Sequence, residues 1–119
     1  MTDESTKTIR ELNDHVRQRI TSPWLIPSGV PAQILKTQGI DALPIEDQLT
    51  ILTSIRDFAD FTEDNDPHGE HDFGSLVHHG QKIFWKIDYY ALDMRRGSEN
   101  PADPSQTVRV LTIMLAEEY

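Results

Sequence analysis

The stretch of sequence that decides the fold is residues 65–90, which read NDPHGEHDFGSLVHHGQKIFWKIDYY. In its second half Ile83, Trp85 and Ile87 share one face of a strand, while Lys82, Phe84, Lys86 and Asp88 share the other, as expected for a strand with one buried face. The dipeptide His79-Gly80 has the chemistry of a two-residue hairpin turn. The stretch therefore predicts an antiparallel hairpin, in which Phe73 faces Lys86, Gly74 faces Trp85, Leu76 faces Ile83 and His71 faces Asp88.

Helices and strands are predicted on both sides of this hairpin. Apolar residues recur at helical spacing over residues 2–20 and 44–58, and Pro44 suits the start of the second helix. Residues 33–37 predict a short strand. The apolar, β-branched run 107–115 predicts a buried strand, although the preceding Asp103-Pro104 resembles a helix cap and leaves a helix as the alternative. We expect one α+β domain over residues 1–119, with two amphipathic helices packed on one face of a small antiparallel sheet of three or four strands.

The segment between the first helix and the first strand, residues 21–31, contains three prolines and a glycine and predicts an ordered loop. Its apolar residues Trp24, Leu25 and Ile26 are costly to leave in water, so we expect the loop to bury them under the core. The alternative is an exposed apolar patch that binds a partner.

The composition narrows the class of protein. Twenty acidic residues against eleven Lys and Arg give a formal charge of −9, which disfavours direct binding to nucleic acid or to an anionic membrane. Because the chain has no cysteine, any metal site must be built from His, Asp and Glu. We expect no signal peptide and no membrane helix, and therefore a cytoplasmic protein. The acidic charge predicts a protein partner.

An acidic run without Lys or Arg spans residues 57–72. It predicts a non-catalytic interaction module that binds a basic, nucleic-acid-binding protein; the simpler alternative is that the charge only keeps a small domain soluble. The residues predicted to form the partner surface are Asp57, Asp60, Glu63, Asp64 and Trp24.

The same run contains residues that could hold a metal. His68, Glu70, His71 and Asp72 are suitable ligands for a divalent ion, and they raise the alternative of a metal-dependent hydrolase or nuclease. Adjacent residues of a strand point to opposite faces, however, so a role in capping turns is favoured for Asp66 and Asp72, with His71 paired to Asp88. We predict no cofactor but leave a divalent metal open, and Lys86 completes the candidate cluster as a partner of Asp88. His78 and His79 are predicted to be solvated turn residues, with metal binding as the alternative.

Three motifs resemble a known family. They are NDPHGEHDFG at residues 65–74, FWKIDYY at 84–90 and RVLTIMLA at 109–116, followed by Glu118-Tyr119. Together they are similar to an uncharacterised bacterial family, domain of unknown function 3768. The resemblance implies a small bacterial protein that is often plasmid- or phage-associated, and it supplies no established activity or catalytic residue. An accessory protein or anti-defence inhibitor of a mobile element fits this setting, and a homodimer formed through a sheet edge or Trp24 is possible.

Overall fold

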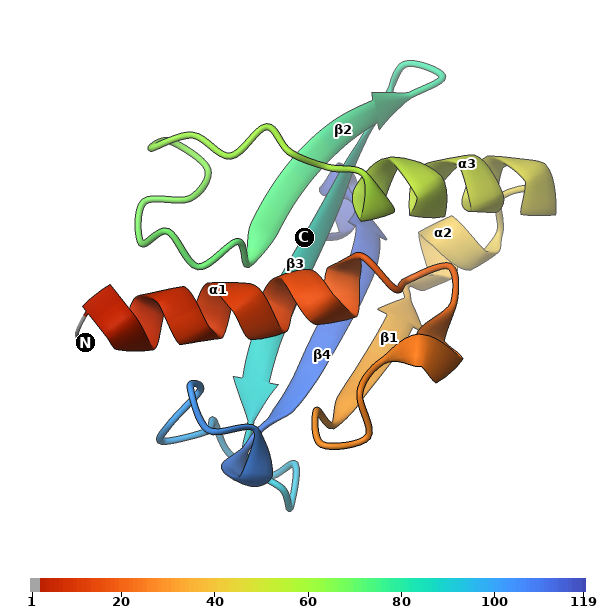
Figure 1. Cartoon of the computed structure of the whole chain (residues 1–119). Helices are drawn as coiled ribbons and strands as arrows, with labels where there is room; N and C mark the ends of the chain where they lie inside the picture. The colour runs from red at the N-terminus through yellow and green to blue at the C-terminus, as the bar shows by residue number, and fades with distance from the viewer. Residues whose placement is uncertain (1–2) are drawn as a thin grey trace.

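The computed structural model describes residues 3–119 and arranges them in two layers, helices on one side and a sheet on the other (Figure 1). The helices are α1 (Asp3–Arg17), α2 (Gln38–Asp41) and α3 (Ile45–Arg56), and the strands are β1 (Ala32–Lys36), β2 (Phe73–His78), β3 (Gln81–Tyr90) and β4 (Val108–Leu115). Short 3-10 turns lie at Pro23–Leu25, Pro104–Gln106 and Ala116–Glu118. No helix of this described part is long and apolar enough to cross a membrane.

The predicted α+β class is confirmed, but the sheet is mixed. The strand order is β1-β4-β3-β2, with β1 parallel to β4 and the other neighbours antiparallel. The expectation of a purely antiparallel sheet was wrong because β1 and β4 are separated in the sequence by two helices and the whole hairpin. No short turn joins them, so local sequence does not set their relative direction.

The hairpin register is largely as predicted. Phe73 faces Lys86, Gly74 faces Trp85 and Leu76 faces Ile83. The turn residues His79 and Gly80 both have positive φ, of 49° and 78°, as a two-residue hairpin turn with the favourable twist requires.

The predicted pairing of His71 with Asp88 was wrong. The strand begins only at Phe73, and His71 has a φ of 56°, which turns the chain away from the sheet. The backbone N–H of Ile87 still donates to the carbonyl oxygen of Asp72 at 2.8 Å, so the pairing reaches Asp72, the residue after His71, but not His71 itself. Asp88 pairs instead with Lys86 on its own strand, at 2.8 Å.

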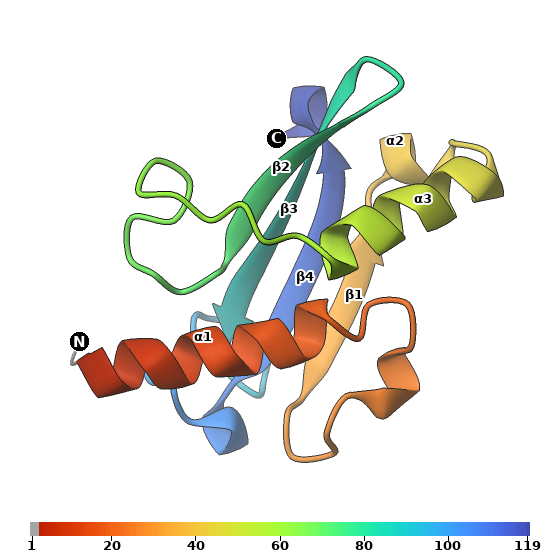
Figure 2. The ribbon, with the colours of Figure 1, turned by 45° about the horizontal axis from the view of Figure 1, so that its top comes forward.

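Both long helices pack on the same face of the sheet, as predicted, and the two views of the ribbon agree on this (Figures 1 and 2). The core between the layers is built from aliphatic residues of the helices and strands around the fully buried Trp85. Gly74, opposite Trp85, leaves room for the indole: a Cβ there would overlap the ring and would lie 2.8 Å from Phe58 Cζ. The absence of a side chain at Gly74 therefore allows the indole of Trp85 to pack in the core.

The segment before β1 is only partly buried. Ile26 and Val30 join the core, whereas Trp24 is 78% and Leu25 60% exposed, so the expectation that all three apolar residues of the loop are buried was wrong. In a 3-10 turn the side chains radiate in three directions, and the Pro23–Leu25 turn therefore cannot direct every one of them inward.

The strand-like run and the cap-like sequence before it are both confirmed at the end of the chain. Residues 108–115 form the predicted buried strand, β4, and the cap-like sequence before it closes the short turn Pro104–Gln106, where the Asp103 side chain accepts from Ser105 N. The two predicted helices are confirmed, with α1 ending at Arg17 and α3 spanning Ile45–Arg56, and Pro44 occupies the N-cap position of α3; residue 2, the predicted start of the first helix, lies outside the described residues.

Candidate functional site

The acidic loop, residues 57–72, joins α3 to β2 and lies along α1 (Figures 1 and 2). Side chains of α1 hold its backbone: Arg10 Nη1 donates to the Gly69 carbonyl at 3.2 Å, and Asn13 Nδ2 donates to the Glu70 carbonyl at 3.0 Å. The loop is thus fixed by contacts that are 57–59 residues apart in the sequence.

Asp66 organises the turn inside the loop, as predicted. Its side chain is buried, and its Oδ1 accepts from the backbone N–H groups of Glu70 at 3.0 Å and His71 at 3.1 Å. Gly69, with a φ of 68°, supplies the left-handed backbone that lets the chain curl around this carboxylate. Asp66 is therefore a structural cap.

His71 is held against α1. Its Nδ1 lies 2.9 Å from Asp14 Oδ1, and its ring stacks on Phe61 with centroids 3.7 Å apart and planes within 5°. Arg17 Nη2 also donates to Asp14 Oδ1, at 3.2 Å. Asp14 thus replaces the predicted Asp88 as the partner of His71.

A buried polar network lies beneath the loop. The Tyr89 hydroxyl donates to Glu70 Oε1 at 2.8 Å and accepts from Asn13 Nδ2 at 2.8 Å. Asn13 Oδ1 accepts from Nε of the fully buried Arg109 at 2.7 Å, and Arg109 Nη2 donates to the Pro101 carbonyl. This Glu70–Tyr89–Asn13–Arg109 network ties the loop, α1, β3 and β4 together.

Burial shifts the pKa of two groups of this network. It raises the pKa of Tyr89 far above the usual range, against the opposing effect of the Asn13 hydrogen bond, and the bond to Glu70 raises it further. Burial also lowers the pKa of Arg109 from its ordinary value. Tyr89 is therefore held as a neutral hydroxyl that can both donate and accept.

The four residues considered as metal ligands are not brought together. Glu70 accepts from Tyr89, His71 is held by Asp14, and His68 is exposed on the outside of the turn. Asp72 is half-buried, and desolvation, followed by the charge of Glu70, raises its pKa. Within residues 3–119, the side chains that converge closely enough to share a metal ion are others, Asp47, His78 and His79.

Lys86 and Asp88 lie apart from the loop. They alternate on β3 with the buried Ile87 and therefore face away from α1 and α3. The hydrogen bond to Asp88 is the main cause that raises the pKa of Lys86. The pair is a same-strand ion pair on the sheet face opposite the helices.

The residues predicted to form a partner surface divide into two places. Asp60, Glu63 and Asp64 are exposed on the acidic loop, while Asp57 pairs with Arg56 at 2.9 Å at the end of α3. Trp24 belongs to the Pro23–Leu25 turn, the orange segment that both ribbon views place beside β1 and away from the green loop (Figures 1 and 2). Trp24 and the loop carboxylates do not form one continuous surface.

Three residues of the polar network were missed from the sequence: Asn13, Tyr89 and Arg109. A signal for two of them was present. Asn13 lies on the apolar stripe of α1 between Ile9 and Val16, and Arg109 is the charged residue of a mostly apolar strand. A polar residue at a core position needs a buried partner, and these two are bonded to each other.

Fold and site together define a two-layer α+β domain in which a polar network fixes an acidic loop. Residues 36–118 match the family described as "Protein of unknown function (DUF3768)", and the chain belongs to this family, as the motifs indicated. The match begins within β1, so α1, which supplies Asn13 and Asp14, lies outside it. No curated protein and no solved structure matches the chain.

Proposed function

We propose that the protein is a non-catalytic interaction module that uses its acidic loop to bind the basic surface of a nucleic-acid-binding protein. The observation that carries this proposal is the outer acidic cluster, defined as Asp60, Glu63 and Asp64. Its three side chains are exposed and form no ion pair with any other residue in the described range 3–119.

Hydrogen bonds between its own residues order the loop that carries the outer acidic cluster. Asn65 Nδ2 donates to the Asp60 carbonyl at 2.8 Å, and Asn65 Oδ1 accepts from Thr62 N at 2.9 Å. Asp66 N donates to the Thr62 carbonyl at 2.8 Å. A loop that is already ordered loses less conformational entropy on binding than a flexible one, which favours its use as a recognition surface.

The charge of the cluster points to the chemistry of the partner. Carboxylates without cationic neighbours attract a positive surface, speed the encounter and disfavour anionic competitors. A basic groove that binds nucleic acid meets this description, and the module would block it by occupying the positions of phosphates. The biological setting that we propose is an accessory or anti-defence inhibitor carried by a mobile element.

The test compares capture of proteins from a bacterial lysate by three forms of the chain. The loop variant Asp60→Asn/Glu63→Gln/Asp64→Asn removes the cluster. The control variant Glu46→Gln/Glu99→Gln/Glu117→Gln removes three exposed charges elsewhere, from side chains that form no hydrogen bond or ion pair within the described residues. Quantitative mass spectrometry measures what each form retains.

We expect the wild type and the control variant to retain the same basic nucleic-acid-binding protein, and the loop variant to lose it. The proposal fails if the loop variant retains the same proteins as the wild type, or if no basic protein is retained by any form.

A further inference from the structure

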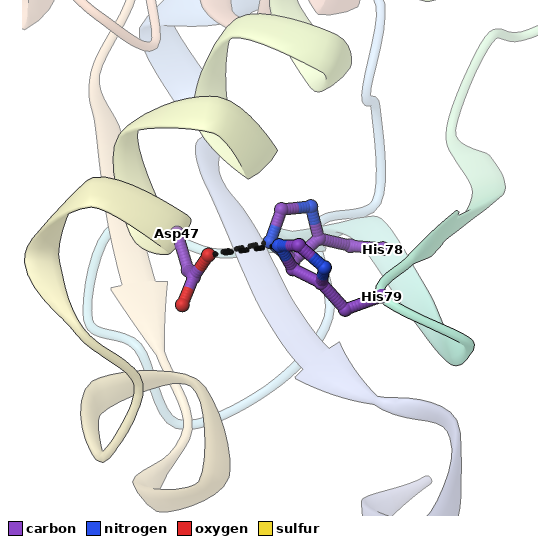
Figure 3. Close-up of side chains that lie close together, drawn as sticks. All are labelled: Asp47, His78 and His79. Atoms are coloured by element: carbon purple, nitrogen blue, oxygen red, sulfur yellow. Dashed lines mark hydrogen bonds and ion pairs between the residues drawn. The ribbon is translucent and has the colours of Figure 1, made fainter.

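Two histidines and one aspartate converge at the tip of the β2–β3 hairpin (Figure 3). We propose that Asp47, His78 and His79 form a binding site for a divalent transition-metal ion, with Zn²⁺ as the preferred ion. The site is separate from the acidic loop, and it does not depend on the proposed interaction with a basic partner.

The hairpin turn places the two imidazoles. His78 is the last residue of β2 and His79 the first residue of the two-residue turn, so the chain reverses directly beneath both rings. The left-handed backbone of His79 swings its side chain to the same side as that of His78, and the rings meet edge to face with centroids 4.2 Å apart. Adjacent residues of a straight strand would instead point to opposite faces.

The third group comes from a different element. Asp47 lies in the first turn of α3, and its Oδ1 is 2.9 Å from His78 Nε2 and 3.3 Å from His79 Nε2. The close-up shows both Nε2 atoms directed at this carboxylate (Figure 3). The fold thus directs three potential ligand atoms at one point, one from Asp47 and two from a pair of histidines at least 31 positions further along the chain.

The distances from the Asp47 carboxylate to the two imidazoles are close to those between metal ligands, and the three ligand atoms all lie within 4.8 Å of one another. Ligands that bind Zn²⁺ at about 2.0–2.1 Å in a tetrahedral arrangement lie about 3.3 Å from one another. The distances of 2.9 and 3.3 Å between Asp47 Oδ1 and the two imidazole nitrogens are close to this value, so small side-chain movements would admit an ion.

The donor set selects the class of ion. Two imidazole nitrogens and a carboxylate suit Zn²⁺, Co²⁺ or Ni²⁺, whereas Ca²⁺ and Mg²⁺ prefer oxygen ligands. The side chain of His79 is 76% exposed, which leaves solvent access for a fourth ligand.

A bound ion would join the hairpin tip to α3. In the structure His78 forms a hydrogen bond with Asp47 and His79 forms an ion-pair contact with the same carboxylate oxygen, and a metal would replace both by stronger bonds to the two elements. Zinc binding should therefore raise the melting temperature, because an ion that binds the folded chain stabilises it.

The test uses the full chain without a histidine tag, titrated with ZnCl₂ by isothermal calorimetry and followed by thermal unfolding. We expect a single Zn²⁺ per chain and a rise in melting temperature with zinc concentration. His79→Asn and Asp47→Asn should each weaken binding by at least about tenfold, since even the loss of a group that supports a metal ligand costs about 10–100-fold. Asn is tolerated in the left-handed backbone of residue 79, so His79→Asn keeps the turn.

The control is His68→Asn, which removes another exposed histidine that is not part of the converging group. It should bind zinc as the wild type does. The proposal is overturned if the wild type binds no zinc in the calorimeter, or if His79→Asn and Asp47→Asn bind it as tightly as the His68→Asn control.

Discussion

At the scale of single residues, the acidic loop owes its shape to polar side chains that face inward. Asp66 caps backbone amides, and Glu70 accepts a hydrogen bond from Tyr89. His71 is hydrogen-bonded to Asp14 and stacks on Phe61. A buried polar group that loses its partner costs more than the bond itself contributes, because it has also lost water. The inward residues are therefore expected to affect stability, and the outward carboxylates to affect binding.

Replacing Tyr89 by Phe tests the polar network. The change leaves Glu70 Oε1 and one Asn13 N–H without the shared hydroxyl, and we expect a loss of about 1–3 kcal/mol in the free energy of unfolding, measured in urea. Tyr90→Phe is the matched control, because the Tyr90 hydroxyl has no hydrogen-bond partner in the described part of the chain. Equal stability of the two variants would contradict the network's role.

Asp72 gives a prediction on pH. Burial raises its pKa, so its ionisation lowers stability as the pH rises from below the ordinary value of about 3.9 through the folded-state value. Asp72→Asn removes this cost. Its melting temperature should exceed that of the wild type at neutral pH, and the difference should shrink below about pH 4. A variant that melts below the wild type at neutral pH would show that the carboxylate makes a stabilising contact.

At the scale of secondary-structure elements, the hairpin is the part fixed by local rules. Its register follows from period-two alternation and from a turn whose two residues have positive φ. Helix α3 and the loop pack on the face that Trp85 fills, with Phe58 and Phe61 edge-on to the indole. Gly74 leaves no room for a side chain, because a Cβ there would overlap Trp85 and lie 2.8 Å from Phe58 Cζ.

Gly74→Ala is expected to destabilise the fold by about 1–3 kcal/mol, because the added methyl group must displace the Trp85 indole or Phe58. Chemical denaturation followed by Trp fluorescence measures this loss. Gly29→Ala is the control: no atom lies within 4 Å of its added methyl group, and its stability should equal or exceed that of the wild type. A neutral Gly74→Ala would mean that the indole has room to move.

The sequence predicted the helices and strands better than it predicted the contacts between distant segments. Alternation identified β3, and helical spacing identified α1 and α3, because these patterns are local. The parallel pairing of β1 with β4 and the contact of His71 with Asp14 join distant segments, and no local pattern encodes them. The convergence of His78 and His79 on Asp47 was missed for the same reason, since residue 47 belongs to another element.

At the scale of the whole molecule, a net charge of −9 is distributed unevenly along the chain, and residues 57–72 contain no Lys or Arg. The helices occupy one face of the sheet, and the acidic loop extends beyond the sheet at the β2 edge (Figures 1 and 2). Some carboxylates of the loop accept hydrogen bonds within the fold, whereas Asp60, Glu63 and Asp64 are exposed to solvent. This division between inner and outer acids is the basis for treating the loop as a binding surface.

The salt dependence of partner capture tests this account most directly. Attraction between exposed charges is screened over about 8 Å at physiological ionic strength and over about 3 Å at 1 M. We therefore predict that proteins captured by the wild type at low salt are released as NaCl rises towards 1 M, and that they match those lost by the Asp60→Asn/Glu63→Gln/Asp64→Asn variant. Capture that persists unchanged to 1 M NaCl would contradict binding through the outer acidic cluster.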